Sequence, residues 1–303
     1  MVNDTYTVTG YHGTATELVI PDTYNGKNVT HIEAKAFKDC TYLTKITMGT
    51  GVIYIGDEAF YGCKNLTSII LQDSITGIGT SAFYDCDGLT DITIPTYITT
   101  ISDQLFGGCD GLVEVTVPDH VTTIGEMAFC GCDSLTTVTI GNRVTDIGNK
   151  AFYSCDQLVS ITMPSGVTTL GNETFYECDS FTGITLPSSL TSIGDKAFNG
   201  CDALTKITIP NSVTNIGEMA FCGCDSLASV TIGNRVTGIG EQAFYSCDKL
   251  TSILIPSSVT SIGSAAFKNC TSLTIYCKAT KAPSGWHTNW NASNCPVVWG
   301  YNK

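Results

Sequence analysis

The sequence predicts an α/β solenoid, in which each 23-residue repeat contributes one strand and one short helical or 3₁₀ turn. Phenylalanine recurs every 23 residues, eleven times from Phe37 to Phe267, and a cysteine follows three positions later each time, from Cys40 to Cys270. A strand with one short turn cannot bury its apolar side alone, but stacked copies can. Residues at the same position of successive repeats then lie above one another and form a column. The expected core consists of the columns of phenylalanine and of leucine, isoleucine and valine.

The strand of each repeat is indicated by alternating apolar residues. In one repeat, Ile92 and Ile94 alternate with Thr93 and the stretch ends at Pro95. Alternation with a period of two is typical of a strand with one buried side, and proline cannot donate to the ladder. The helical or 3₁₀ turn is expected next in the repeat, as in residues 125–132.

The two ends depart from the repeat, as capping segments do. Residues 1–30 are predicted to form an N-terminal β cap, with two strands and a turn at Asn25-Gly26. Residues 31–277 hold the eleven repeats. Residues 278–303 form a C-terminal cap that contains all three tryptophans, Trp286, Trp290 and Trp299.

Composition excludes several classes of protein. The chain is 43% hydrophobic and 14% charged, and no apolar run reaches the roughly 18–20 residues of a spanning helix. We therefore expect no membrane insertion by this chain. The net charge of −13, without a basic cluster, argues against a nucleic-acid partner. The N-terminus has neither the basic nor the apolar region of a signal peptide, so such a peptide is absent from this chain.

Catalytic and cofactor motifs are missing from the sequence. The four histidines are isolated, and no nucleophile elbow, zinc-protease or phosphate-loop pattern occurs. The strings that begin at Gly77 and Gly238 resemble a dinucleotide motif, but each is the Ile-Gly of the repeat preceded by a chance glycine. We expect no catalytic residues, no cofactor and no enzyme.

Two kinds of column could be read as metal sites. Aspartates follow the cysteine and acidic residues follow the Ile-Gly of many repeats, which fits either turn capping or calcium; their spacing matches no calcium loop. The cysteine column fits reduced, buried, structural thiols, and its alternatives are a metal array or a disulfide ladder between successive coils. Cys130 and Cys222 lie outside the cysteine column, at positions expected to be exposed, and form two Cys-x-Cys pairs without further ligands. We predict no metal site.

Two cysteines lie in or next to the C-terminal cap. Cys277 and Cys295 are outside the cysteine column and are candidates for a disulfide if the protein is secreted.

Outward positions of the strands supply the candidate binding surface. Threonine alternates there with inward Ile or Val, and the preceding outward position is small, polar or charged. The surface fits either a partner-binding face or a solvated face. The twelve residues of this candidate face are Lys45, Thr47, Asp91, Thr93, Glu114, Thr116, Thr139, Thr162, Thr185, Lys206, Thr208 and Thr231.

A tyrosine column follows the phenylalanines. It fits either a binding interface or a shield over the edge of the turn. Its members are Tyr61, Tyr84, Tyr153, Tyr176 and Tyr245.

The repeat, with its A-F-x-x-C and L-x-x-I-x-I-P segments, resembles the BspA-like leucine-rich repeats of bacterial and some protist surface proteins. The resemblance covers residues 16–303, and the paired-Trp tail with its P-V-V-W-G-Y ending resembles tails that follow such repeats. It implies a leucine-rich-repeat horseshoe or arc. It also implies an extracellular or cell-surface location and adhesion to host or neighbouring-cell proteins.

We therefore expect a non-enzymatic adhesin-type module that acts as a monomer. Its partner would be a host matrix or cell-surface protein, with a glycan as a second class. Two alternatives stay open at this point: a structural spacer that holds an absent domain away from the cell, and the ligand-recruiting part of a larger secreted hydrolase.

Overall fold

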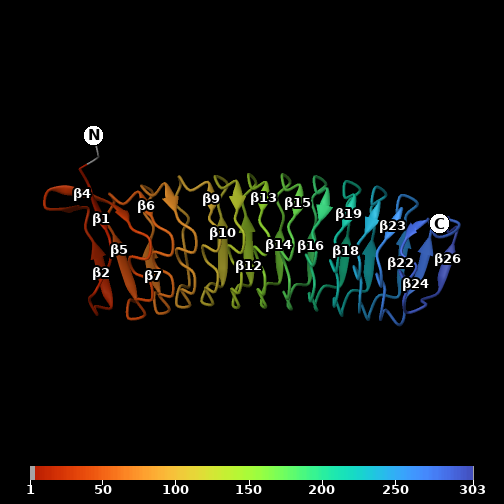
Figure 1. The fold of residues 1–303 in the computed structure, drawn as a ribbon. Helices are drawn as coiled ribbons and strands as arrows, with labels where there is room; N and C mark the ends of the chain where they lie inside the picture. The colour runs from red at the N-terminus through yellow and green to blue at the C-terminus, as the bar shows by residue number, and fades with distance from the viewer. Residues whose placement is uncertain (1–3, 303) are drawn as a thin grey trace. The chain divides into compact units, whose positions relative to one another are not determined.

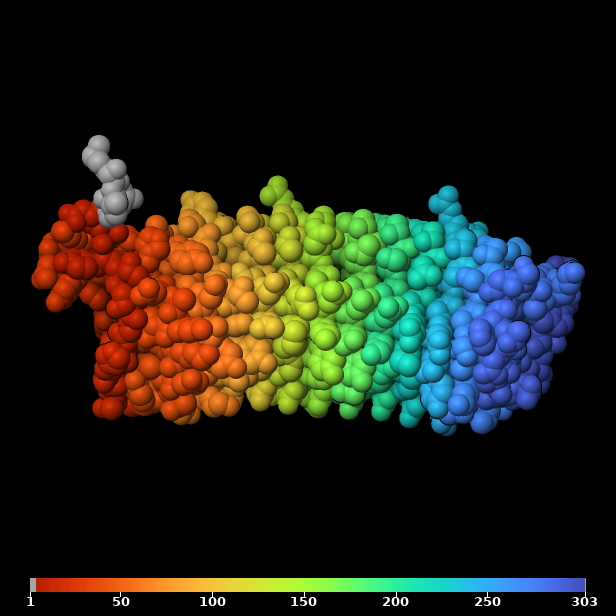
Figure 2. All heavy atoms as spheres, viewed as in Figure 1, coloured from red at the N-terminus to blue at the C-terminus, as the bar shows by residue number. Residues whose placement is uncertain are grey.

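The structure, a computed structural model that describes residues 4–302, consists of strands joined by turns (Figure 1). The chain divides into two compact units, Met1–Val144 and Thr145–Lys303. In each unit, every repeat makes one coil of a parallel β-solenoid, and Figure 2 shows successive coils as parallel bands of atoms. The predicted solenoid of stacked repeats is confirmed.

Each coil has two strand-forming sides, which we call the threonine side and the glycine side. The threonine side holds the outward threonines, and the glycine side ends at the Ile-Gly of the repeat. In the first unit the threonine side consists of β2 (Glu17–Ile20), β5 (Lys45–Met48), β7 (Ser68–Ile70), β10 (Glu114–Val117) and β12 (Thr137–Ile140). Its glycine side consists of β1 (Tyr6–Val8), β4 (Lys27–Ile32), β6 (Tyr54–Ile55), β8 (Gly77–Ile78), β9 (Thr100–Ile101) and β11 (Thr123–Ile124).

The second unit repeats this plan with parallel pairing on both sides. Its threonine side consists of β14 (Ser160–Thr162), β16 (Gly183–Thr185), β18 (Lys206–Thr208), β20 (Ser229–Thr231), β22 (Ser252–Ile255), β24 (Thr274–Cys277) and β26 (Val297–Trp299). Its glycine side consists of β13 (Asp146–Ile147), β15 (Thr169–Leu170), β17 (Ser192–Ile193), β19 (Asn215–Ile216), β21 (Gly238–Ile239), β23 (Ser261–Ile262) and β25 (Gly285–Trp286).

The N-terminal end contains an antiparallel hairpin. Strand β3 (Thr23–Tyr24) pairs with the start of β4 across Asn25 and Gly26. Both turn residues have positive φ angles, 47° and 76°, as a two-residue hairpin turn of the Asn-Gly type requires. The turn predicted at this position is confirmed.

The helical or 3₁₀ turn predicted in each repeat is wrong, because no residue between 4 and 302 is helical. In the segment that follows Gly56, alternate amides donate in two directions. The amides of Ala59, Tyr61 and Cys63 donate to the carbonyl three residues earlier, and those of Glu58, Phe60 and Gly62 donate to the next coil. Glu58 and Gly62 have positive φ angles, 54° and 69°, which end any right-handed helix. Bonds between coils therefore replace the α component of the predicted fold.

The phenylalanine column forms the centre of the core in each unit. All eleven rings are less than 2% exposed. In the second unit the Phe221 ring stacks on Phe198 and on Phe244, with ring centroids 5.3 Å apart in both cases. Phe37, Phe60 and Phe83 stack in the same way in the first unit. The core predicted from the repeat is confirmed.

The glycine of the Ile-Gly pair is required by close approach between coils. A Cβ on Gly217 would lie 2.5 Å from the carbonyl carbon of Gly194 in the preceding coil. No side chain fits there without moving backbone, so the glycine sets how closely the coils stack.

Candidate binding face

All twelve residues of the candidate face have exposed side chains. In the first unit, parallel pairing places Thr116 beside Thr139, while Lys45 and Thr47 lie beside Ser68 and Ile70. The chain alternates exposed and buried residues along these strands, so the inward Ile and Val side chains hold the outward ones in place.

The second unit brings four of its five candidate residues into neighbouring pairs. Thr162 lies beside Thr185, and Thr208 lies beside Thr231. Lys206, the fifth, pairs with Ser229. The face thus consists of short rows of hydroxyls with isolated charges at their sides.

The candidate side chains differ from other threonines in their hydrogen bonding. The twelve make no side-chain hydrogen bond or ion pair to any residue between 4 and 302. In contrast, threonines at two other repeat positions donate to a carbonyl of the preceding coil, as Thr67 does to Thr44 and Thr237 does to Thr214. Those threonines have a structural role, whereas the candidate hydroxyls are available to an external partner.

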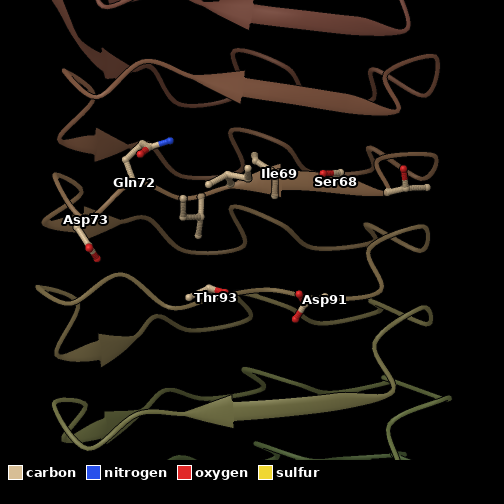
Figure 3. Close-up of a pocket in the computed structure, with 9 residues that line it drawn as sticks. Ser68, Ile69, Gln72, Asp73, Asp91 and Thr93 are labelled. Carbon is tan, nitrogen blue, oxygen red and sulfur yellow. The ribbon is translucent and has the colours of Figure 1, made fainter.

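The threonine side of the first unit is interrupted at residues 91–94. Exposed Asp91 and Thr93 alternate with buried Ile92 and Ile94, as predicted for a strand. However, the backbone of this segment makes no hydrogen bond to another residue in the described range 4–302, so the predicted ladder is missing here. Figure 3 shows Asp91 and Thr93 on this unpaired segment, next to Ser68 and Ile69 of β7.

Two shallow pockets flank the unpaired segment. One has a volume of ≈ 420 Å³ and is lined by Ser68, Gln72, Asp73 and other residues up to Thr93. The other, of ≈ 440 Å³, lies toward Glu114. Both contain Asp91 and Thr93 in their lining, so these two candidate residues border both pockets.

A third pocket occupies a similar break in the second unit. Strands β16 and β18 are neighbours that belong to different hydrogen-bonded sheets. A pocket of ≈ 410 Å³ lies between them, lined by Thr185, Lys206, Thr208 and adjacent residues. The sequence analysis missed these breaks. In the first unit a signal was present, because Gln72 replaces the proline or glycine that ends most strands of the repeat.

Acidic residues after the Ile-Gly bond the next coil. Oδ1 of Asp57, Asp103 and Asp195 each accepts the amide of the residue 23 positions later. The backbone-bonding role predicted for this column is confirmed for these three aspartates, with the bond running between coils instead of within a turn. Among residues 4–302, no group of three or more His, Cys, Asp or Glu side chains is arranged to hold a metal ion.

The aspartates that follow the cysteines repel one another. Burial and the charge of Asp225 raise the pKa of Asp202, and burial and Asp133 raise the pKa of Asp110. A pKa raised in the folded state means that the fold binds the proton more readily than the unfolded chain does. The stability that protonated Asp110 and Asp202 contribute is therefore lost as pH rises through the raised pKa. It is regained as pH falls toward the ordinary value of 3.8.

We expect Asp202→Asn to raise the melting temperature at neutral pH and low salt, because it removes a repelled charge. This advantage should disappear as pH falls to 3.8, where the carboxyl is protonated. Glu58→Gln is the control of opposite sign, because bonding to Lys38 lowers the pKa of Glu58 and its loss should reduce the melting temperature at neutral pH. Identical thermal scans of Asp202→Asn and the parent protein at neutral pH would contradict the repulsion.

The cysteine column is buried, as predicted, and each thiol has a specific partner. Sγ of Cys63 donates to the carbonyl of Phe37, and Sγ of Cys224 donates to that of Phe198, each at 3.1 Å. Burial raises the pKa of the Cys63 thiol to about 12, so the thiolate is suppressed. Cysteine therefore supplies a small buried donor to the preceding coil.

Of the two cap cysteines, Cys295 is placed differently from the prediction. Cys295 was expected outside the column, but its Sγ lies next to the carbonyl oxygens of Cys270 and Phe267, so it continues the column. Cys277 ends β24 beside Trp299 of β26. Both thiols are free and buried in the structure, and a disulfide between them stays a prediction.

Cys130, expected to be exposed, is 5% exposed. The neighbouring coil has Gly107 at the equivalent position, and the Cys130 sulfur and the Tyr84 ring fill the space that a side chain there would take. Cys222 is half-buried.

The tyrosine column forms stacked, half-buried pairs. Tyr61 lies 5.2 Å from Tyr84, and Tyr153 lies 4.8 Å from Tyr176, measured between ring centroids. Lys38 caps the first pair, with Nζ 4.3 Å from the Tyr61 centroid. Stacking of this kind fits the shielding role, because much of each ring faces its neighbour.

Comparison with known families decides the relationship of this chain. The model of the BspA type leucine-rich-repeat region, which spans six copies of the repeat, matches residues 30–158 and again residues 145–274. The chain belongs to the BspA-type leucine-rich-repeat family. Leucine-rich-repeat proteins of this type generally act in protein interaction. No helix between residues 4 and 302 is long and apolar enough to cross a bilayer.

Three solved structures of bacterial proteins are similar to this chain in fold. A leucine-rich cell surface protein of Faecalibacterium prausnitzii is 30% identical with a TM-score of 0.65, over 100% of this chain and 92% of that one. A leucine-rich-repeat protein of Bacteroides ovatus is 28% identical with a TM-score of 0.65, over 93% and 83%. The pneumococcal vaccine antigen PcpA shares the fold at 20% identity, with a TM-score of 0.64 over 95% and 80%. No curated protein matches the sequence.

Proposed function

We propose that this BspA-type chain is a non-enzymatic recognition module at a bacterial cell surface. It binds a protein of a host matrix or of a neighbouring cell through the candidate face. The observation that carries the proposal is that the twelve exposed side chains of this face are not used in hydrogen bonds within residues 4–302, whereas other threonine columns are. Parallel coils hold such side chains at a regular spacing, which suits many modest contacts with an extended partner.

The surface location is supported by the similarity to the F. prausnitzii protein, which is described as a cell surface protein. Threonine hydroxyls and separated charges would recognise a polar protein surface, and the pockets at Asp91 and Lys206 would receive side chains that project from it. A glycan is the second partner class that this chemistry fits.

Surface plasmon resonance of the purified chain against extracellular matrix proteins and glycans tests the proposal. We expect saturable binding that the triple substitution Lys45→Ala, Glu114→Ala and Lys206→Ala abolishes. The matched control replaces Lys64, Glu126 and Lys249, which are also exposed but lie off the candidate face, and it should leave binding unchanged.

Two outcomes would contradict parts of the proposal. Binding that survives the face triple but not the control triple would move the site to another surface. Silence across the panel with a folded sample would favour the spacer.

A further inference from the structure

The two ends of the solenoid expose strand edges of the same type. Among residues 4–302, β2 pairs with β5 alone on the threonine side at the N-terminal end, and β26 pairs with β24 alone at the C-terminal end. The glycine side has the same arrangement, since β1 pairs with β4 alone and β25 with β23 alone. All four of these pairings are parallel. Free edges of this kind are templates for pairing with another chain.

Exposed apolar residues mark both edges. Val19 on β2 is 69% exposed, and Val298 and Trp299 on β26 are 40% and 37% exposed. Val19 pairs with Thr47 and Val298 with Tyr276, so both valines occupy the outward column. Trp299 pairs with buried Cys277, which places it in the inward column although it is partly exposed. Within the repeats, the coil that follows covers such an inward residue. A further coil added at the C-terminal end would therefore cover Trp299.

The N-terminal end has an apolar hollow at the matching position. It has a volume of ≈ 160 Å³ and is lined by Val8, Tyr11, Leu18, Ile20 and neighbouring residues. Ile20 is the inward residue that follows Val19 on β2, as Trp299 follows Val298 on β26. If β26 of one molecule added to β2 of another with the columns in register, Val298 would meet Val19 and Trp299 would meet Ile20.

The charged residues at the two ends of the chain favour a second copy of the protein as the partner that covers each edge. No aspartate or glutamate follows Asp248, and five lysines do: Lys249, Lys268, Lys278, Lys281 and Lys303. Residues 1–33 contain four acids, Asp4, Glu17, Asp22 and Glu33, against the single base Lys27. In a chain with a net charge of −13, the C-terminal end is the basic part, and it is complementary to the acidic N-terminal end of another copy.

We propose that this protein associates head to tail with itself, with β26 of one copy adding in parallel to β2 of the next. The contact is heterologous, so each molecule offers two different surfaces and the assembly grows as an open chain. In Figure 1 the loop beside the β4 label projects at the top of the N-terminal end, whereas β2 lies lower on that end. This inference departs from the monomer expected from the sequence.

Sedimentation equilibrium of the 303-residue chain tests the proposal. We expect the average mass to rise above 32.2 kDa with concentration at low salt, and to return to that value at high salt as the end charges are screened. A mass of one chain at every concentration and salt would overturn the proposal and leave the β2 edge to a different occupant.

Two edge variants test the head-to-tail geometry. Val19→Lys places a positive charge against the basic end, and Val298→Glu places a negative charge against the acidic end. Each variant alone should lose the rise in mass, and a mixture of the two should regain it, because each variant keeps one intact edge and the two substituted positions carry opposite charges. Both side chains are exposed, so melting temperatures should match that of the parent protein.

Ile70→Lys is the matched control, because it replaces an exposed apolar residue of the same outward column, away from both ends. It should leave association unchanged. Association that persists in both edge variants, or a mixture that stays monomeric, would contradict the proposed contact.

Discussion

Phe221→Ala is expected to lower the free energy of unfolding by about 3–5 kcal/mol, as truncation of fully buried aromatic residues does. The Phe221 ring is 0% exposed and stacks on both neighbouring rings of the column, with ring centroids 5.3 Å apart. The rings on either side are held by their own coils, whose glycines fix the spacing, so the cavity cannot close by a small shift of the backbone. The loss should therefore lie toward the upper end of the range.

Urea denaturation followed by circular dichroism measures this effect. Tyr97→Ala is the control, because it also removes an aromatic ring, from a side chain that is 65% exposed. We expect that change to alter stability by less than about 0.5 kcal/mol. Equal losses in the two variants would mean that the phenylalanine column is not the core.

The second large effect is expected from a charge in the cysteine column. Cys224 is 0% exposed, and its thiol donates to the carbonyl of Phe198 at 3.1 Å. Burial raises the pKa of this thiol, so the site already disfavours charge. Cys224→Lys would force a larger side chain with an ammonium group into this fully buried position, and we expect it to destabilise the protein by more than about 4 kcal/mol.

The repeat itself provides a control for this substitution. Cys222 lies two positions earlier and is half-buried, so Cys222→Lys makes the same chemical change where the side chain reaches water. Thermal unfolding should show a much larger fall in melting temperature for Cys224→Lys than for Cys222→Lys. Similar melting temperatures would contradict the burial of the column.

The period of 23 residues was sufficient to predict the stacking, the core columns and the outward position of the candidate face. These features follow from the pattern of apolar and polar side chains, which can be read directly from the sequence. The turn after the Ile-Gly could not be predicted in the same way. The sequence around Glu126, Ala128 and Phe129 fits a single helical turn, but amides such as those of Phe60 and Gly62 bond the next coil instead. Hydrogen bonds between stacked coils, which no single repeat can make alone, override the local propensity for a helical turn.

The cap and the ladder breaks show the same limit. Cys295 follows the preceding column cysteine, Cys270, after 25 residues instead of 23, so the period hides its place in the column. The loss of pairing at residues 91–94 was not predicted either, because Asp91 to Ile94 keep the alternating pattern of a strand, and the one departure from the repeat is Gln72 in the preceding coil. For the candidate face, the sequence indicated which threonines point outward, but only the hydrogen bonds separated the structural threonines from the available ones.

The bonds between coils also determine how the protein would respond to tension. In each unit the amides of the segment after the Ile-Gly donate alternately within their own coil and to the next coil, so hydrogen bonds link each coil to its neighbours along the chain. A coil pulled from one end releases 23 residues, which extend to about 75 Å, and the coils behind it keep their own bonds. A protein built this way would lengthen in steps under load, without losing the fold of the coils that stay stacked.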